Sequence, residues 1–151
     1  MYHHDSAAIH AEPSGNCSGS SDAELGGLTT IQGGFWLTFV SNNSRQSHDV
    51  ALVKVLGTNV GAIHWLTDTA GIEETNAHLV PYGSNFLAFW KSSSTVKLVL
   101  LDPNGAILMG PEDLAVDFTQ QTDMTDFSNG DAGWAWGSGS HLKIARIRLC
   151  Q

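Results

Sequence analysis

The sequence predicts an all-β chain, and three observations support this prediction. The chain has 16 glycines and 4 prolines in 151 residues, a composition that suits many tight turns. No segment shows a convincing helix start. Short apolar segments alternate with breaks rich in Ser, Gly and Asn, as strands alternate with turns. This length allows one hydrophobic core but not two, so we expect a single repeat domain over residues 1–151.

An apolar strand follows each of three glycines. The copies start at Gly33, Gly83 and Gly130, which lie 50 and 47 residues apart. Four and six positions after each glycine the chain carries apolar residues, namely Leu37 and Phe39, Leu87 and Phe89, and Trp134 and Trp136. Because side chains two positions apart share one face of a strand, we predict that each pair packs between neighbouring units.

A second strand and a third element follow in the same order. The second strands are predicted at residues 50–56, 96–101 and 142–149. The third element is Ala62-Ile63-His64 in one copy and Ala106-Ile107-Leu108 in the next, where it follows an Asn-Gly turn.

The last copy has no third element, but Ala8-Ile9-His10 near the N-terminus matches it. We therefore predict two complete units, 33–82 and 83–129, and one split unit. Its inner strands lie in residues 130–151 and its outer strands in residues 1–32.

The segment "GSNFLAFWKSSSTVKLVLLDPNGAILMG", residues 83–110, resembles bacterial β-propeller repeats, in which an aromatic-rich inner strand precedes a strand that ends in an Asp-x-x-Gly turn. The resemblance implies four-stranded antiparallel blades, about three per chain. Because closed rings typically have about 4–8 blades, we expect either a fragment of a longer propeller or a dimer with six blades. A β-trefoil, which also has three repeats of about four strands, is the alternative fold.

The split blade has a consequence for the two cysteines. Cys17 lies in its N-terminal part and Cys150 in its C-terminal part, so the resemblance implies that they meet. We expect a disulfide there, either within one chain or between two.

Catalytic, metal and cofactor sites are not expected. The seven histidines lack the spacing of metal ligands. The acid pairs Glu73-Glu74 and Glu112-Asp113 suit a solvated surface better than a glycosidase cleft.

Charge limits the partners. The net charge of −8 would repel nucleic acid and anionic membranes alike. No apolar segment approaches the roughly 20 residues that span a bilayer. The first residues lack the features of a signal peptide, yet an extracellular or secreted location is favoured.

The aromatic residues outside the packing register suggest a binding function. Trp36, Trp65 and Trp90 are expected to be exposed, and Asn42 and Asn43 lie in a polar loop, residues 41–48. Flat aromatic faces beside polar groups suit sugar rings. We therefore predict a non-catalytic recognition module that binds carbohydrate or protein. The alternatives are a structural unit that assembles into a closed ring, and a propeller glycosidase fragment.

Overall fold

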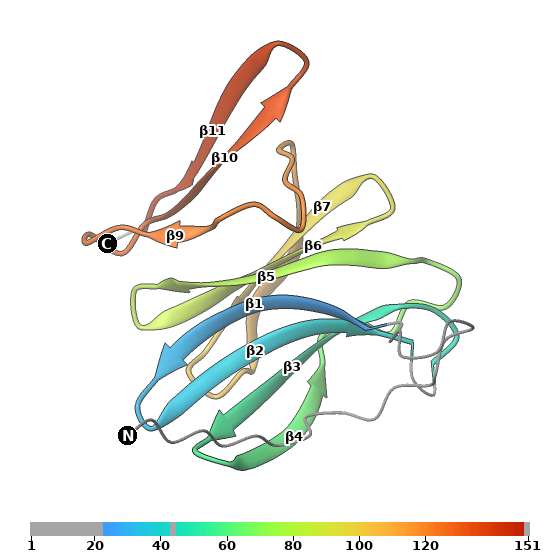
Figure 1. Cartoon of the computed structure of the whole chain (residues 1–151), viewed down its shortest axis with the longest axis vertical. Helices are drawn as coiled ribbons and strands as arrows, with labels where there is room; N and C mark the ends of the chain where they lie inside the picture. Colours follow the sequence, from blue (N-terminus) through green and yellow to red (C-terminus); the bar gives the residue numbers. More distant parts are fainter. Residues whose placement is uncertain (1–22, 43–44, 150–151) are drawn as a thin grey trace, which may run out of the picture.

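The computed structural model describes residues 23–42 and 45–149, and this part of the chain is all-β (Figure 1). It contains eleven strands and no helix, so no helix here could cross a membrane. The strands form three separate antiparallel sheets. The predicted fold class is thus confirmed at the level of all-β architecture.

Each sheet uses consecutive strands. The first contains β1 (Glu24–Ile31), β2 (Gly34–Ser41), β3 (Asp49–Leu56) and β4 (Asn59–Trp65). The second contains β5 (Glu74–Tyr82), β6 (Asn85–Ser92), β7 (Thr95–Leu101) and β8 (Ile107–Leu114). The third contains β9 (Thr125–Asp126), β10 (Ala132–Ser138) and β11 (His141–Ile147). The predicted second strands of the three units are β3, β7 and β11.

The sheets divide the chain at other points than the predicted units. Gly33 and Gly83 lie in the two-residue hairpin turns that join β1 to β2 and β5 to β6. Both have positive φ, 80° and 61°, which explains why glycine recurs there. β1 therefore belongs to the first sheet and not to a unit shared with the C-terminus. Residues 1–22 of the predicted split unit lie outside the described residues.

The hairpin registers also shift the predicted alignment by one residue. Ile31 pairs with Gly34, whereas Tyr82 pairs with Asn85, so Gly33 is the second turn residue and Gly83 the first. Matching the turns equates Phe39 with Trp90 rather than with Phe89. The closing pairs Ser92 to Thr95 and Ser138 to His141 likewise equate Trp90 with Trp136. A shift of one residue exchanges the two faces of a strand.

The first and second sheets pack face to face through a core rich in aromatic residues. The first sheet contributes Trp36, Val40, Val50 and Leu52. The second sheet contributes Ala77, Leu79, Phe86, Ala88, Trp90, Val99 and Leu101. Trp36 also donates a hydrogen bond from Nε1 to the Pro103 carbonyl, at 3.3 Å, and so reaches the turn before β8.

The opposite face of the second sheet packs against the third sheet. Its side chains Val80, Leu87, Phe89, Val96 and Leu98 contact Ala132 and Trp134, together with Phe118 from the connecting segment. The rings of Phe89 and Trp134 meet edge to face, with centroids 5.1 Å apart. Phe89 and Trp134 thus pack between sheets, as predicted for their strands.

With the shifted alignment, successive sheets pack in the same sense. The face of the second sheet that carries Ala88 and Trp90 receives the first sheet, and the equivalent face of the third, with Trp134 and Trp136, receives the second. The far face of the third sheet is left open: Leu142 and Ile144 are 76% and 77% exposed. The corresponding face of each preceding sheet is covered by its successor.

The first strands of two sheets, β1 and β5, run side by side with their backbones in near contact, at the centre of Figure 1. A Cβ atom at Gly27 would lie 2.3 Å from the backbone nitrogen of Leu79. One at Gly26 would lie 2.8 Å from the carbonyl oxygen of Ala77. Thr29 donates a hydrogen bond from Oγ1 to the Leu79 carbonyl, at 3.3 Å. Only glycine allows β1 to approach β5 this closely.

We expect Gly27→Ala to destabilise the protein, because its methyl group would collide with backbone that cannot rotate away. Overpacking of this kind costs about 1–3 kcal/mol in the free energy of unfolding, which denaturant titration measures. Gly137→Ala is the matched control, since a Cβ there meets nothing within 4 Å. Equal stabilities for the two variants would contradict the conclusion that the close approach of β1 to β5 requires glycine.

Candidate functional site

Two of the three predicted aromatic site residues are not exposed. Trp36 is 1% exposed and Trp90 is 2% exposed. Both lie in the core between the first and second sheets. The expectation that they are exposed was wrong, because the neighbouring sheet covers the strand face to which they point. Neither side chain can therefore stack on a ligand at the surface.

The third predicted aromatic residue, Trp65, lies half-buried on β4. The Arg45 guanidinium carbon lies 4.2 Å from its ring centroid, and the Phe39 ring meets it edge to face. Asn42 is half-buried at the start of the predicted polar loop. Asn43 lies outside the described residues, as do Cys17 and Cys150, so the predicted disulfide stays a prediction.

The polar loop borders a cavity of about 320 Å³, lined by Arg45, Gln46, Ser47, Asp49, Asp68 and Ala70. Arg45 forms ion pairs with Asp49 and, at 2.8 Å, with the exposed Asp68. It also donates a hydrogen bond to the Thr67 carbonyl, at 2.9 Å. Because the Arg45 guanidinium is already bound to groups of the same chain, this cavity is the weaker candidate for a ligand site.

Two buried carboxyl groups beside this cavity share one hydroxyl. Asp49 and Glu74, 1% and 2% exposed, both hydrogen bond to Thr67 Oγ1. Burial raises the pKa of Glu74, and the nearby Asp49 charge adds to the effect. Burial also acts to raise the pKa of Asp49, but hydrogen bonds led by Arg45 outweigh it and leave that pKa lowered. The prediction that the Glu73-Glu74 pair is solvated was wrong for Glu74.

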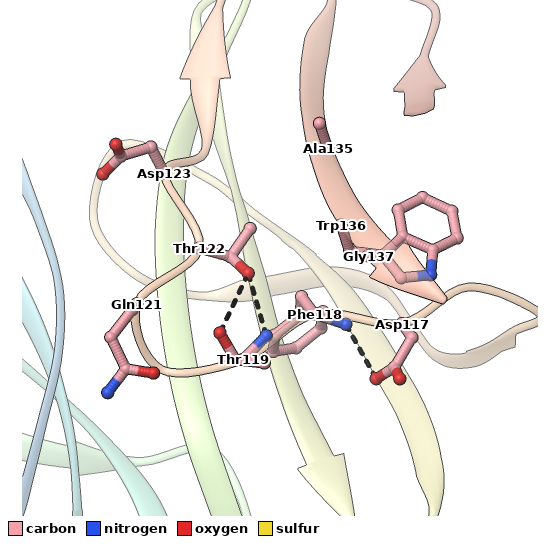
Figure 2. A pocket seen from close by; sticks show the side chains of 9 residues that line it. All are labelled: Asp117, Phe118, Thr119, Gln121, Thr122, Asp123, Ala135, Trp136 and Gly137. Atoms are coloured by element: carbon pink, nitrogen blue, oxygen red, sulfur yellow. Dashed lines mark hydrogen bonds between the residues drawn. The ribbon is translucent and has the colours of Figure 1, made fainter. Parts of the chain in front are cut away.

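The strongest candidate site is a cavity of about 410 Å³ beside the third sheet, shown in Figure 2. The segment that joins β8 to β9 lines one side, and β10 lines the other. The lining residues are Asp117, Phe118, Thr119, Gln121, Thr122, Asp123, Ala135, Trp136 and Gly137. The cavity is thus bordered by two carboxylates, two hydroxyls, an amide and an indole.

Phe118 anchors the loop side of this cavity. The residue is fully buried, and its ring meets His78 and Phe89 edge to face, with centroids 5.2 and 6.4 Å away. On either side of it, the loop backbone accepts two hydrogen bonds from the sheets. Trp134 Nε1 donates to the Asp117 carbonyl, and His78 Nε2 donates to the Thr119 carbonyl, each at 3.0 Å. The loop is therefore fixed to both sheets.

Local hydrogen bonds orient the polar groups at the rim. Asp117 accepts from the Phe118 amide and pairs with Lys91 Nζ, at 2.8 and 2.6 Å. The Lys91 ammonium lowers the pKa of Asp117, so this carboxyl is an anion at neutral pH. The Thr119 amide donates to Thr122 Oγ1 at 2.9 Å, which closes a tight turn at the rim (Figure 2).

The opposite side of the cavity is an open strand edge. β9 pairs with β10 at Ala132 and Gly133 only. From Trp134 onward, this edge of β10 has no strand partner among residues 23–42 and 45–149. Because alternate residues of an unpaired edge direct their N–H and C=O groups outward, this edge adds hydrogen-bonding capacity to the side chains of the rim.

Only a partial signal for this site is present in the sequence. Trp136 was predicted to pack between units, and it does contact the core on one side while it lines the cavity. The polar segment 115–124 carried no motif. No cluster of three or more metal-binding side chains occurs in the part of the chain that the structure describes. The site offers oriented hydrogen-bonding groups and an aromatic surface, without a recognisable nucleophile and base pair.

The comparisons with known proteins add no assignment. No protein-family model, no curated protein and no solved structure matches the chain.

We expect acidification to weaken the attachment of the cavity loop. Burial lowers the pKa of His78 below 6.5, although its hydrogen bond to Thr119 and the Asp123 charge act in the other direction. Neutral His78 therefore contributes stability above pH 6.5 that is lost as the pH falls through the lowered pKa. His78→Gln keeps a donor for Thr119 but does not titrate. The free energy of unfolding of wild type should fall relative to this variant below pH 6.5. Parallel curves would contradict the assignment.

Proposed function

We propose that the chain is a non-catalytic recognition module that binds carbohydrate in the cavity beside β10. The observation that supports it most is that Trp136, Asp117, Asp123 and two threonine residues line one cavity of about 410 Å³. A sugar ring presents apolar C–H patches and hydroxyl groups together. It needs an aromatic surface and hydrogen-bond acceptors at close range.

We also propose that this module has a propeller-type fold. Three consecutive sheets, each packed on the next by the equivalent face, fit successive blades of a propeller. Separate sheets of this kind favour blades over the β-trefoil alternative. The cavity lies between β10 of the blade-like third sheet and the connecting segment 115–124, which leads from the second sheet to the third.

Binding to a glycan array followed by calorimetric titration tests the proposed function. Trp136→Ala should weaken binding about tenfold or more, which corresponds to about 1.4 kcal/mol, because the stacking surface is removed. Asp123→Asn should weaken it as well, since the amide replaces one acceptor by a donor.

Trp65→Ala is the matched control, since Trp65 is also a half-buried tryptophan but lies on β4, away from the cavity. It should leave affinity unchanged. Binding to no glycan on a broad array, or equal loss on Trp65→Ala and Trp136→Ala, would contradict the proposal.

A second candidate function is self-assembly, and the open face of the third sheet favours it. Leu142 and Ile144 stand side by side on β11 at 76% and 77% exposure. Exposed apolar patches of this kind commonly mark interaction sites. In the first two sheets, the equivalent face is covered by the next sheet along the chain. We therefore propose that a second copy of the chain covers this face of the third sheet. Two copies would supply six blades.

Light scattering coupled to gel filtration tests this second candidate. The wild-type mass should be twice the 16.1 kDa of one chain. Leu142→Asp should return it to one chain, because a carboxylate on this face cannot be buried without a partner. Lys143→Asp, the adjacent residue on the other face of β11, is the control. A wild-type mass of one chain at every concentration would contradict self-assembly.

A further inference from the structure

A second cavity lies on the other side of the loop that joins β8 to β9. Its volume is about 270 Å³, and its walls are residues 26–28 of β1, residues 78–79 of β5 and residues 120–124 of the loop. Residues 121–123 line this cavity and also the cavity of about 410 Å³ beside β10. The two cavities therefore adjoin each other across the loop.

The crest of the loop between the two cavities carries accessible polar groups. Gln121 and Asp123 are exposed, and Thr122 is half-buried. Figure 2 shows the Gln121 and Asp123 side chains pointing away from Trp136. The Gln120 side chain hydrogen bonds to the Leu25 carbonyl, which fixes the loop to β1. A ligand that lies across the crest thus meets hydrogen-bonding groups on both sides of the loop.

The charges around the two cavities are unfavourable for an anion. Among the residues that the structure describes, no lysine or arginine lines either cavity, whereas Asp117 and Asp123 do. Lys91 is paired with Asp117 at 2.6 Å. His78 is uncharged at neutral pH, because burial lowers its pKa. Carboxylates repel an anionic ligand but accept hydrogen bonds from the hydroxyl groups of a sugar.

We propose, on the basis of the function proposed above, that the ligand is an uncharged oligosaccharide of at least two sugar units that lies across residues 121–123. One unit lies beside Trp136, and the next lies in the second cavity beside Leu28, which is 56% exposed on β1. The Thr122 and Asp123 side chains, which border both cavities, form hydrogen bonds with the hydroxyl groups of the two units.

Calorimetric titration with sugar chains of increasing length tests this inference. The probes are chains of one to four units of β-1,4-linked glucose, α-1,4-linked glucose, β-1,4-linked mannose and β-1,4-linked N-acetylglucosamine. In at least one series, a longer chain should bind about tenfold or more tightly than the single sugar, because it occupies both cavities. A single sugar that binds as tightly as its longer chains would overturn the inference and leave the proposed function standing. Binding of no probe would overturn the inference, while the glycan array decides the proposed function separately.

Leu28→Ala tests whether the second unit lies in the second cavity. It should remove most of the gain from chain length, whereas Trp136→Ala should weaken the binding of chains of every length. Leu25→Ala is the matched control, since Leu25 is also an exposed leucine of β1, at 69%, but lines neither cavity. An undiminished gain in Leu28→Ala, or equal losses in the two leucine variants, would overturn the inference.

The charge of the ligand is tested separately. The chain that binds most tightly is compared with its derivative in which the C6 hydroxyl groups are oxidised to carboxylates. The derivative should bind about tenfold or more weakly, and added salt should reduce this difference, because it screens the repulsion. Equal affinities for the two chains would overturn the assignment of an uncharged ligand.

Discussion

The close approach of β1 to β5 is the constraint on which the rest of the structure depends. Gly26 and Gly27 let two backbones approach to a distance that excludes any Cβ atom. Thr38 fixes this segment from the other side, since its Oγ1 accepts a hydrogen bond from the Gly27 amide at 2.8 Å. This contact sets the first sheet against the second and so buries Trp36 and Trp90 in one core. Aromatic side chains of this size contribute much of the packing energy of such an interface.

The second sheet is the middle layer, and a neighbouring sheet packs against each of its faces. One face holds Trp90 against the first sheet, and the other holds Phe89 against Trp134 of the third. An aromatic residue on either face of β6 is therefore unavailable to a ligand. The third sheet differs because its far face has no neighbour in the described part of the chain. Leu142 and Ile144 of β11 consequently remain exposed.

The candidate site arises from the shortness of β9. In the first two sheets the initial strand pairs along most of its neighbour, whereas β9 pairs at two positions. The chain before it forms a loop, which Phe118 and His78 fix to the sheets. Acidic and hydroxyl side chains then face an open edge of β10 with Trp136 beside them. The charge of Asp117 is maintained by Lys91, a residue of the middle sheet.

The sequence by itself determined the all-β class and the paired strands β2–β3, β6–β7 and β10–β11, because alternating apolar residues and turn residues are local signals. It also located Trp134 and Phe89 in packing positions. The tertiary structure alone decided the faces, since a difference of one residue between the turns at Gly33 and Gly83 exchanges the two sides of a strand. Trp36 and Trp90, which the sequence placed at the surface, are buried because each points to a sheet face that the neighbouring sheet covers. The burial of Glu74 and the position of the cavity loop could not be predicted from the sequence either, because residues distant in the chain form their environments.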